Sequence, residues 1–284
     1  MKKVAVLGST GMAGHVIATY LEEKEYVIYN TSRSAANNKN SASIDACNIE
    51  ELEKWLDKVD PDYVINCIGV LQNDSDQRPD KAILLNAFLP QKLAFKYKNS
   101  QTKVIHLSTD CVFSGATGGY TEDSTQDGTT IYDRSKALGE IRNCKDLTFR
   151  MSIIGPDINE NGGGLFNWFM KQSGKINGYT KAVWNGVTTI ELARAIDSAI
   201  KCDLRGLYHL TPQTPILKYD LLSLIGDVFD RDDIQIEPYD AFVVDKTLVN
   251  TRTDFDFIIS SYPEMVVDMK KWVDAHRDLY GYRY

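Results

Sequence analysis

Tyr132 and Lys136 lie four residues apart, a spacing that places two side chains on the same face of a helix. Reduction of a carbonyl group delivers a hydride to carbon and leaves an alkoxide that must take up a proton. A free tyrosine has a pKa of ~10, and a nearby ammonium favours the phenolate and lowers that pKa. The pair therefore indicates proton exchange by Tyr132, with Lys136 supplying the ammonium and a hydrogen bond to a nicotinamide ribose.

Thr109 directly follows a predicted buried strand, residues 104–107. Ligands bind at the carboxyl ends of the strands in open α/β sheets, so a hydroxyl there can meet the tyrosine and the lysine. Its predicted role is to hold the substrate oxygen in line. A tyrosine and a lysine at this spacing often occur by chance, and Thr109 is what favours catalysis. Thr109, Tyr132 and Lys136 are the predicted catalytic set.

A glycine-rich turn joins the first predicted strand, residues 4–7, to the first predicted helix, residues 15–23. Gly8 permits a tight turn, Gly11 lets the backbone approach a pyrophosphate, and Gly14 allows close packing of helix on strand. The helix N-terminus then faces the negative charge. This context favours a dinucleotide-binding loop over a plain connector. The residues predicted to contact the cofactor here are Gly8, Thr10, Gly11, Met12, Ala13 and Gly14.

The end of the second predicted strand bears on the choice between NADP(H) and NAD(H). An NAD-selective enzyme usually places a carboxylate there, whereas this chain has hydroxyls and a guanidinium, including Ser32 and Arg33. These groups suit a 2′-phosphate, so NADP(H) is favoured and NAD(H) stays open. A solvated loop arginine is the alternative for Arg33. Asp45 is expected either to accept from the adenine amino group or to form a turn.

Short apolar β-branched runs alternate with helical patterns through the first half of the chain, which predicts an α/β fold with a doubly wound parallel Rossmann sheet. We expect a dinucleotide-binding domain over residues 1–152 and a smaller C-terminal α/β substrate-binding region over residues 153–284, with the helix at 188–202 returning to the first domain. Pro90 should bend or split the helix at 81–98. The expected strands cover residues 4–7, 26–29, 43–44, 63–65, 104–107, 147–149 and 206–210, and the other expected helices cover residues 49–59, 132–143, 165–172, 218–229 and 262–280.

Composition excludes several classes of partner. The 284-residue chain has a formal net charge of −7, so it has no basic surplus for nucleic acid or for an anionic membrane surface. The apolar run after Lys3 is too short for a signal peptide or a membrane span, which predicts a cytoplasmic protein. Five scattered cysteines and four histidines without close spacing predict no disulfide framework and no metal site. A homodimer is an option that the sequence leaves open.

Five motifs occur in a characteristic order. They are residues 8–14, residues 66–69, Asn86, residues 108–115 and residues 132–136. In this order the chain resembles the extended short-chain dehydrogenases/reductases, and within them the dTDP-4-dehydrorhamnose reductase group. The run Ser-Thr-Asp-x-Val-Phe-x-Gly at 108–115 is the most specific of the five.

The resemblance implies an NAD(P)H-dependent reductase of a nucleotide-linked 4-keto-6-deoxysugar, acting in deoxysugar or polysaccharide biosynthesis. It implies catalytic roles for Thr109, Tyr132 and Lys136. It further implies that Ile68, Gly69 and Val70 lie along the cofactor, and that Thr109 and Asp110 face the sugar.

Two positions depart from that group. Cys111 stands where the rhamnose enzymes often have tyrosine, and residues 150–155 lack the tryptophan that often packs against the sugar. A roomier pocket follows, and a UDP-linked 2-acetamido-2,6-dideoxy-4-ketohexose is the alternative substrate, unless Trp168 or Trp184 fills the space. The related sugar-nucleotide 4,6-dehydratases carry a glutamate after this aspartate, and the acid pair expels water. Cys111 follows Asp110 here, so the resemblance disfavours dehydration. A sugar-nucleotide epimerase stays an alternative.

The second half offers candidate substrate contacts in Trp184, Lys246 and Arg252. Local cations are needed because an acidic protein must hold a diphosphate. For Lys246 and Arg252 alike, an ordinary surface charge without a substrate contact is an equally good interpretation. The aromatic tail at 280–284 is expected to serve packing or a subunit contact. A non-enzymatic alternative is a dinucleotide-binding regulatory subunit like that of methionine adenosyltransferase, which the intact catalytic set disfavours.

Overall fold

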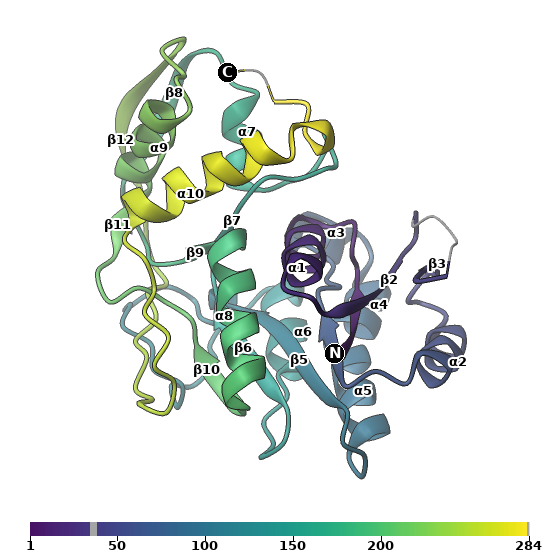
Figure 1. Cartoon of the computed structure of the whole chain (residues 1–284). Coiled ribbons are helices and arrows are strands. Elements are labelled where there is room, and N and C mark those ends of the chain that lie inside the picture. The colour runs from purple at the N-terminus through teal and green to yellow at the C-terminus, as the bar shows by residue number, and fades with distance from the viewer. Residues whose placement is uncertain (35–38, 283) are drawn as a thin grey trace.

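The computed structural model describes residues 1–34, 39–282 and 284. Its main feature is a seven-stranded parallel sheet with the order β10-β6-β5-β4-β1-β2-β3 (Figure 1). This is the strand order of a doubly wound Rossmann sheet, so the predicted α/β fold is confirmed. The strands are β1 (Lys3–Leu7), β2 (Val27–Ser32), β3 (Ser41–Ser43), β4 (Tyr63–Asn66), β5 (Lys103–Thr109), β6 (Leu147–Met151) and β10 (Gly206–His209).

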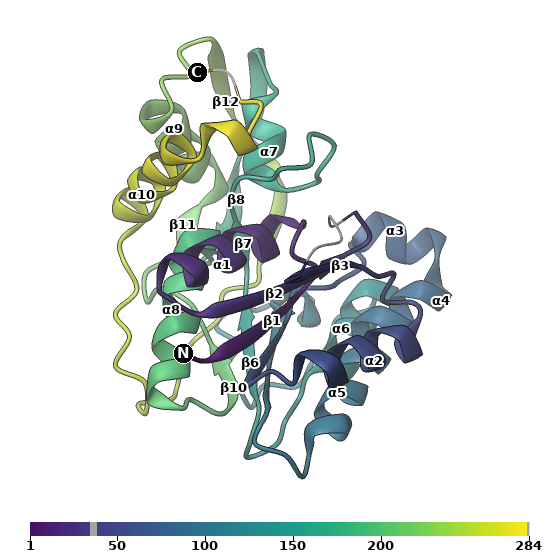
Figure 2. The ribbon, with the colours of Figure 1, turned by 45° about the vertical axis from the view of Figure 1, so that its right-hand side comes forward.

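Alternate residues of each central strand pack into different cores, because successive strand side chains point to opposite faces of the sheet. Val4 and Val6 of β1 pack with α1 (Met12–Glu23) and α8 (Thr189–Cys202). Ala5 and Leu7 pack on the other face. That second face is covered by α2 (Ile49–Val59), the π-helix η1 (Ile83–Phe88) and α5 (Leu89–Tyr97), as Figure 2 shows.

Pro90 lies where a helix was expected to bend or split. The chain there forms α4 (Pro79–Ala82), then η1, then α5 with Pro90 in its first turn. Proline is tolerated in the first turn of a helix because its missing N–H has no intrahelical partner there. The chain is nonetheless helical without a break from Pro79 to Tyr97, with the wider turn of η1 just before α5, so the expected split is not seen. Two helices end sooner than expected: α6 (Ile131–Gly139) and α10 (Tyr262–Ala275).

The second half builds a smaller unit with its own core, in which a three-stranded sheet of order β11-β8-β12 packs against helices. β8 (Gly174–Trp184) and β12 (Ile234–Asp245) are long strands that the sequence did not predict. Helix α8 packs on α1, and β10 extends the central sheet beside β6. The boundary near residue 152 stays a prediction. The remaining elements are α3 (Gln72–Gln77), η2 (Asp110–Val112), β7 (Ile153–Ile154), α7 (Leu165–Met170), β9 (Val187–Thr188), β11 (Ile216–Leu217), α9 (Lys218–Val228) and η3 (Arg277–Leu279).

Candidate active site

The glycine-rich turn has the geometry that a dinucleotide requires. Gly8 has a φ of +77°, a conformation that favours glycine, and its N–H donates to the carbonyl of Thr31 at 2.8 Å. A Cβ on Gly14 would lie 2.2 Å from the carbonyl oxygen of Gly8. Gly11 caps α1 without a side-chain hydrogen bond. The first N–H groups of this helix therefore stay available for an anion.

A cavity of about 730 Å³ opens beside this turn, a size typical of small-molecule sites. The buried hydroxyl of Thr31 lies in its wall and has no hydrogen-bond partner in the described part of the chain, so the wall offers a polar group to a ligand. Met12, Ala13 and Gly14 begin α1 and are not among the residues that line the cavity, so their contacts with the cofactor stay predictions. The predicted residues that do line the cavity are Gly8, Thr10, Gly11, Ser32, Arg33, Asp45, Ile68, Gly69 and Val70.

Two cations face Asp45 at the end of this cavity. The N–H of Cys47 donates to Asp45 at 3.0 Å, and this bond, with the charges of Lys81 and Arg33, holds the pKa of the carboxyl below its usual value. Lys81 lines the cavity as Arg33 does. Sequence reasoning missed Lys81, because a lysine on a helix has no local feature that marks it as a ligand contact.

The catalytic residues meet at the carboxyl end of β5. The Thr109 hydroxyl accepts from the N–H of Cys111 at 3.1 Å and donates to Asp110 Oδ1 at 3.1 Å. Tyr132 lies in the first turn of α6 and within hydrogen-bonding reach of Thr109. Lys136 Nζ donates to the carbonyl of Leu107 at 2.7 Å.

A capping box sets the start of α6 and so the position of Tyr132. Thr130 accepts from the N–H of Asp133, whose carboxylate accepts from the N–H of Thr130. Such reciprocal bonds satisfy two of the free N–H groups at a helix start. The structure thus brings Thr109, Tyr132 and Lys136 together, as the spacing indicated, although their roles in catalysis stay predictions.

Burial shifts the pKa values of the two titratable residues in opposite directions. It lowers the pKa of Lys136 to about 8, an effect that the charge of Glu140 opposes. It raises the pKa of Tyr132, although the bond with Thr109 acts in the other direction. The expected lowering of the tyrosine pKa is wrong for this structure, because desolvation of the phenolate dominates and the ammonium is directed at Leu107. At neutral pH Tyr132 holds its proton and Lys136 is mostly charged.

Glu140 forms a buried ion pair that sequence reasoning missed. Its carboxylate accepts from Arg150 Nε at 2.7 Å and from Nη2 at 2.6 Å, and from the Ser108 hydroxyl at 2.8 Å. Both charged side chains are fully buried. Burial raises the pKa of Glu140, but the hydrogen bonds and charge of Arg150 outweigh this effect and keep the group ionised. An anion thus lies one helical turn beyond Lys136.

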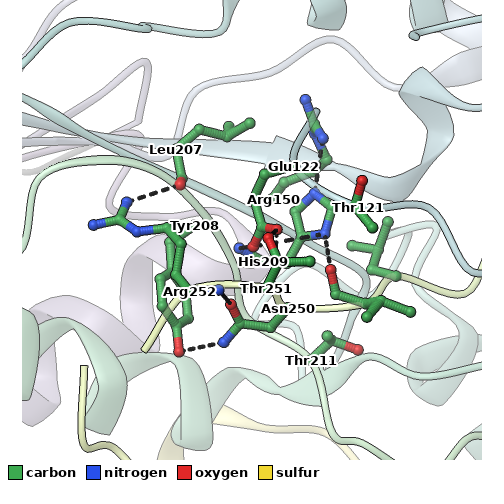
Figure 3. Close-up of polar contacts among 12 residues, drawn as sticks. Thr121, Glu122, Arg150, Leu207, Tyr208, His209, Thr211, Asn250, Thr251 and Arg252 are labelled. Atoms are coloured by element: carbon green, nitrogen blue, oxygen red, sulfur yellow. Dashed lines mark hydrogen bonds and ion pairs between the residues drawn. The ribbon is translucent and has the colours of Figure 1, made fainter. Parts of the chain in front are cut away.

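The same arginine continues the network toward the C-terminal half, as Figure 3 shows. Arg150 Nη1 lies 2.7 Å from Nε2 of His209, whose Nδ1 lies 3.0 Å from the carbonyl of Val249. Burial and the charge of Arg150 lower the pKa of His209 to about 4, so the neutral ring accepts at Nε2 and donates from Nδ1. Glu122 accepts from the N–H of His209 and from the Thr251 hydroxyl. The network therefore ties β5, β6 and β10 to residues 249–251.

Asp110 is the predicted sugar contact that lies beside Thr109. Burial raises the pKa of this carboxyl, and the charges of Lys246 and Lys218 oppose the effect. Lys246 was predicted as a substrate contact, whereas Lys218, at the start of α9, was missed. Two lysines from distant segments of the chain thus lie close enough to Asp110 for their charges to act on its carboxyl group.

The predicted substrate contact of Trp184 is wrong. The indole is only 6% exposed, donates to the Ser152 hydroxyl at 2.8 Å and packs against the ring of Tyr262. It belongs to the core of the C-terminal unit and offers no open wall to a sugar. Trp168 on α7 is 40% exposed.

The predicted substrate contact of Arg252 is also wrong. Its Nη1 donates to the carbonyls of Arg205 at 2.6 Å and of Leu207 at 2.8 Å, and Figure 3 shows the second of these bonds. Its Nε donates to Asp254 at 2.9 Å. The two carbonyls lie at the start of β10, whereas the catalytic residues lie at the carboxyl end of the parallel sheet. The guanidinium is structural because its bonds to the carbonyls of Arg205 and Leu207 secure the C-terminal segment to the start of that strand.

Across residues 1–34, 39–282 and 284, no cluster of three or more His, Cys, Asp or Glu side chains could hold a metal ion. None of the helices in the described part of the chain is long and apolar enough to cross a bilayer.

Comparisons with known proteins agree with this fold. The chain is 30% identical over 245 residues to the probable low-salt glycan biosynthesis reductase Agl14 of Haloferax volcanii. The matched region covers 82% of each chain. It is 22% identical over 257 residues to methionine adenosyltransferase 2 subunit beta of Xenopus tropicalis, covering 84% of this chain and 75% of that protein. The solved structure of a dTDP-4-dehydrorhamnose reductase from Bacillus anthracis in complex with NADP has the same fold, with a TM-score of 0.81 at 20% identity over 96% of this chain and 99% of that chain.

Residues 1–244 match the family described as the RmlD substrate binding domain. The expected membership of the extended short-chain dehydrogenases/reductases is confirmed by this match, and the expected class, an NAD(P)H-dependent oxidoreductase, is confirmed at the level of the family. The chain therefore belongs to the RmlD substrate-binding-domain family.

Proposed function

We propose that this protein reduces the 4-keto group of a nucleotide-linked 6-deoxysugar, with NADPH preferred over NADH. The observation that carries the proposal is the meeting of Thr109, Tyr132 and Lys136 at the carboxyl end of β5, on the sheet edge that also carries the dinucleotide cavity. The similarity to a reductase of glycan biosynthesis supports the same chemistry.

A bound nicotinamide would supply the hydride. Tyr132 donates the proton that the new alkoxide requires, because burial keeps the phenol protonated at neutral pH. Thr109 orients the substrate oxygen toward that phenol. Lys136 is charged and buried, so it stabilises the phenolate that remains after the transfer.

The diphosphate of the substrate would be held by Lys246 and Lys218. The described residues provide no ion-pair partner within 4.0 Å of either ammonium, whereas both charges act on Asp110 beside Thr109. In a protein with net charge −7, two such cations near the catalytic residues favour a polyanionic substrate.

The preference for NADPH rests on the far end of the cavity. Arg33 and Lys81 approach Asp45 there, and a 2′-phosphate would add an anion between cations. Asp45 itself would accept from the adenine amino group.

Two sugars are candidates, and the side chains at Cys111 and Ile153 bear on the choice between them. Neither side chain supplies the ring surface expected in the rhamnose enzymes, and Trp184 is buried elsewhere. A UDP-linked 4-keto-2-acetamido-2,6-dideoxyhexose is therefore a candidate beside the dTDP-linked rhamnose precursor.

A panel of dTDP- and UDP-linked 4-keto-6-deoxysugars, incubated with the protein and NADPH, tests the proposal through the absorbance of the reduced nicotinamide. We expect stoichiometric oxidation of NADPH with at least one sugar. An epimerase would convert the sugar without net oxidation. A regulatory subunit, the role suggested by the similarity to the Xenopus protein, would bind NADPH and leave every sugar unchanged.

A further inference from the structure

The C-terminal tail, residues 280–284, lies beyond the 244 residues that match the family. It follows α10 and returns to the two walls of the dinucleotide cavity. Tyr280 and Tyr282 stack with ring centroids 5.8 Å apart. The Tyr282 hydroxyl bonds to the backbone of Asp157 in the cavity wall, and the Tyr280 hydroxyl bonds to His15, whose ring contacts Gly11 in the wall. Packing alone does not account for these hydroxyl contacts, since a phenylalanine would fill the same space.

Tyr280 reaches the glycine-rich turn through His15. Trp272 Nε1 donates to the Tyr280 hydroxyl at 2.9 Å, and that hydroxyl lies 2.8 Å from His15 Nε2. His15 Nδ1 lies 2.9 Å from the carbonyl of Gly11. Burial lowers the pKa of His15, so the ring is neutral, and one tautomer satisfies the whole chain: Tyr280 donates to Nε2, and Nδ1–H donates to Gly11.

Tyr282 reaches the opposite wall. Its hydroxyl accepts from the N–H of Asp157 at 2.7 Å and donates to the carbonyl of the same residue at 3.3 Å. Asp157 and the two residues that follow it line the cavity, as Gly11 does. The ring of Tyr282 also packs edge-on against Phe166 of α7. Figures 1 and 2 both show this end of the chain near α7.

We propose that Tyr280 and Tyr282 are positioning residues that hold the two walls of the dinucleotide cavity at the spacing the cofactor requires. The proposal rests on the cofactor site assigned above. It explains why Tyr282 bonds directly to backbone atoms of Asp157 in the cavity wall, and why Tyr280 reaches the backbone carbonyl of Gly11 through the ring of His15.

Tyr280→Phe and Tyr282→Phe test the proposal, with Tyr284→Phe as the matched control. Tyr284 lies in the same tail, but its hydroxyl donates only to Asp274 of α10 at 2.9 Å and touches neither wall. The dissociation constant for NADPH is measured by titration of nicotinamide fluorescence. We expect each of the first two variants to raise Kd about five-fold, the change that corresponds to about 1 kcal/mol. The control should keep the wild-type Kd.

Hydrogen exchange provides a second readout that needs no cofactor. The amide of Asp157 should exchange faster in Tyr282→Phe than in the wild type, and at the wild-type rate in Tyr284→Phe. The proposal is overturned if Tyr280→Phe and Tyr282→Phe bind NADPH with the Kd of the wild type. It is also overturned if Tyr284→Phe raises Kd as much as these two variants do. Failure of the wild type to bind NADPH would instead overturn the cofactor assignment.

Discussion

Replacement of Glu140 by glutamine should move the alkaline limb of the activity profile to lower pH. Burial sets the pKa of Lys136 at about 8 while Glu140 opposes that effect. Groups four apart on a helix are ~6 Å apart, where unit charges interact by ~3 kcal/mol at an effective dielectric constant of ~20. Arg150 keeps its charge in this variant, so the whole interaction with Glu140 is lost, and we expect a fall of up to about two pH units.

The direction of the pH shift follows from the protonated form of Lys136, which is the form that catalysis requires. Lysine is charged below its pKa, and the charged form stabilises the tyrosine phenolate, so activity is lost as pH rises through the pKa of Lys136. Lowering that pKa removes activity at a lower pH. The other titratable groups around the ammonium are Cys67, whose pKa burial raises to about 12, and His106, whose pKa burial lowers well below its usual range. Neither titrates near pH 8, and the tyrosine titrates far above it.

The assay is kcat against pH from 6 to 10 with saturating NADPH and sugar nucleotide. Glu122→Gln is the matched control, because Glu122 belongs to the same buried network through His209 but does not act on Lys136. Unpairing Arg150 costs about 3–5 kcal/mol, so the double variant Glu140→Gln with Arg150→Met serves if the single variant does not fold. An alkaline limb that stays near pH 8 in the variant, or moves equally in the control, would refute the reasoning.

The remaining predictions concern single side chains. Tyr132→Phe should lower kcat by a factor of about 10²–10⁴, as for loss of a general acid, with the Kd for NADPH unchanged in a fluorescence titration; near-normal kcat would exclude it as the proton donor. Arg33→Ala and Lys81→Ala should each raise the Kd for NADPH more than that for NADH, and equal changes would make both bystanders. Lys246→Ala should raise KM for the sugar nucleotide, whereas Arg252→Ala should lower thermal stability and leave KM unchanged; the reverse pattern would restore Arg252 as a substrate contact.

Features that depend on neighbours in sequence were predictable. The order of strands and helices, the glycine-rich turn and the Tyr132–Lys136 pair each arise within a short segment. The meeting with Thr109 was also predictable, since every strand of a parallel sheet ends at the same edge.

Features that depend on distant partners were not predictable. β8 has glycines and lysines among its apolar residues, and it forms because β12 pairs with it from sixty residues further along the chain. The buried pair of Glu140 and Arg150 joins a helix end to a strand across ten residues, with no local pattern to mark it. The pKa of Tyr132 was predicted in the wrong direction because the sequence shows the charge beside it but not its burial.

The two wrong substrate contacts have one cause. Trp184 and Arg252 were chosen by residue type and by position in the second half of the chain. The structure instead gives the indole to a hydrophobic core and the guanidinium to backbone carbonyls at the opposite edge of the sheet. Lys218, by contrast, lies in no recognisable motif and acts on Asp110 through the fold alone.

Transfer of deuterium from NADPH that carries deuterium at both positions of the nicotinamide C4 tests the central claim most directly. Labelled cofactor is incubated with the protein and a nucleotide-linked 4-keto-6-deoxysugar, and the product is analysed by mass spectrometry and NMR. The account predicts one deuterium at C4 of the sugar for each NADPH oxidised, and almost none in Tyr132→Phe over the same time. A sugar that is epimerised without deuterium, or a wild-type protein that binds the labelled cofactor and transfers nothing to any sugar of the panel, would contradict it.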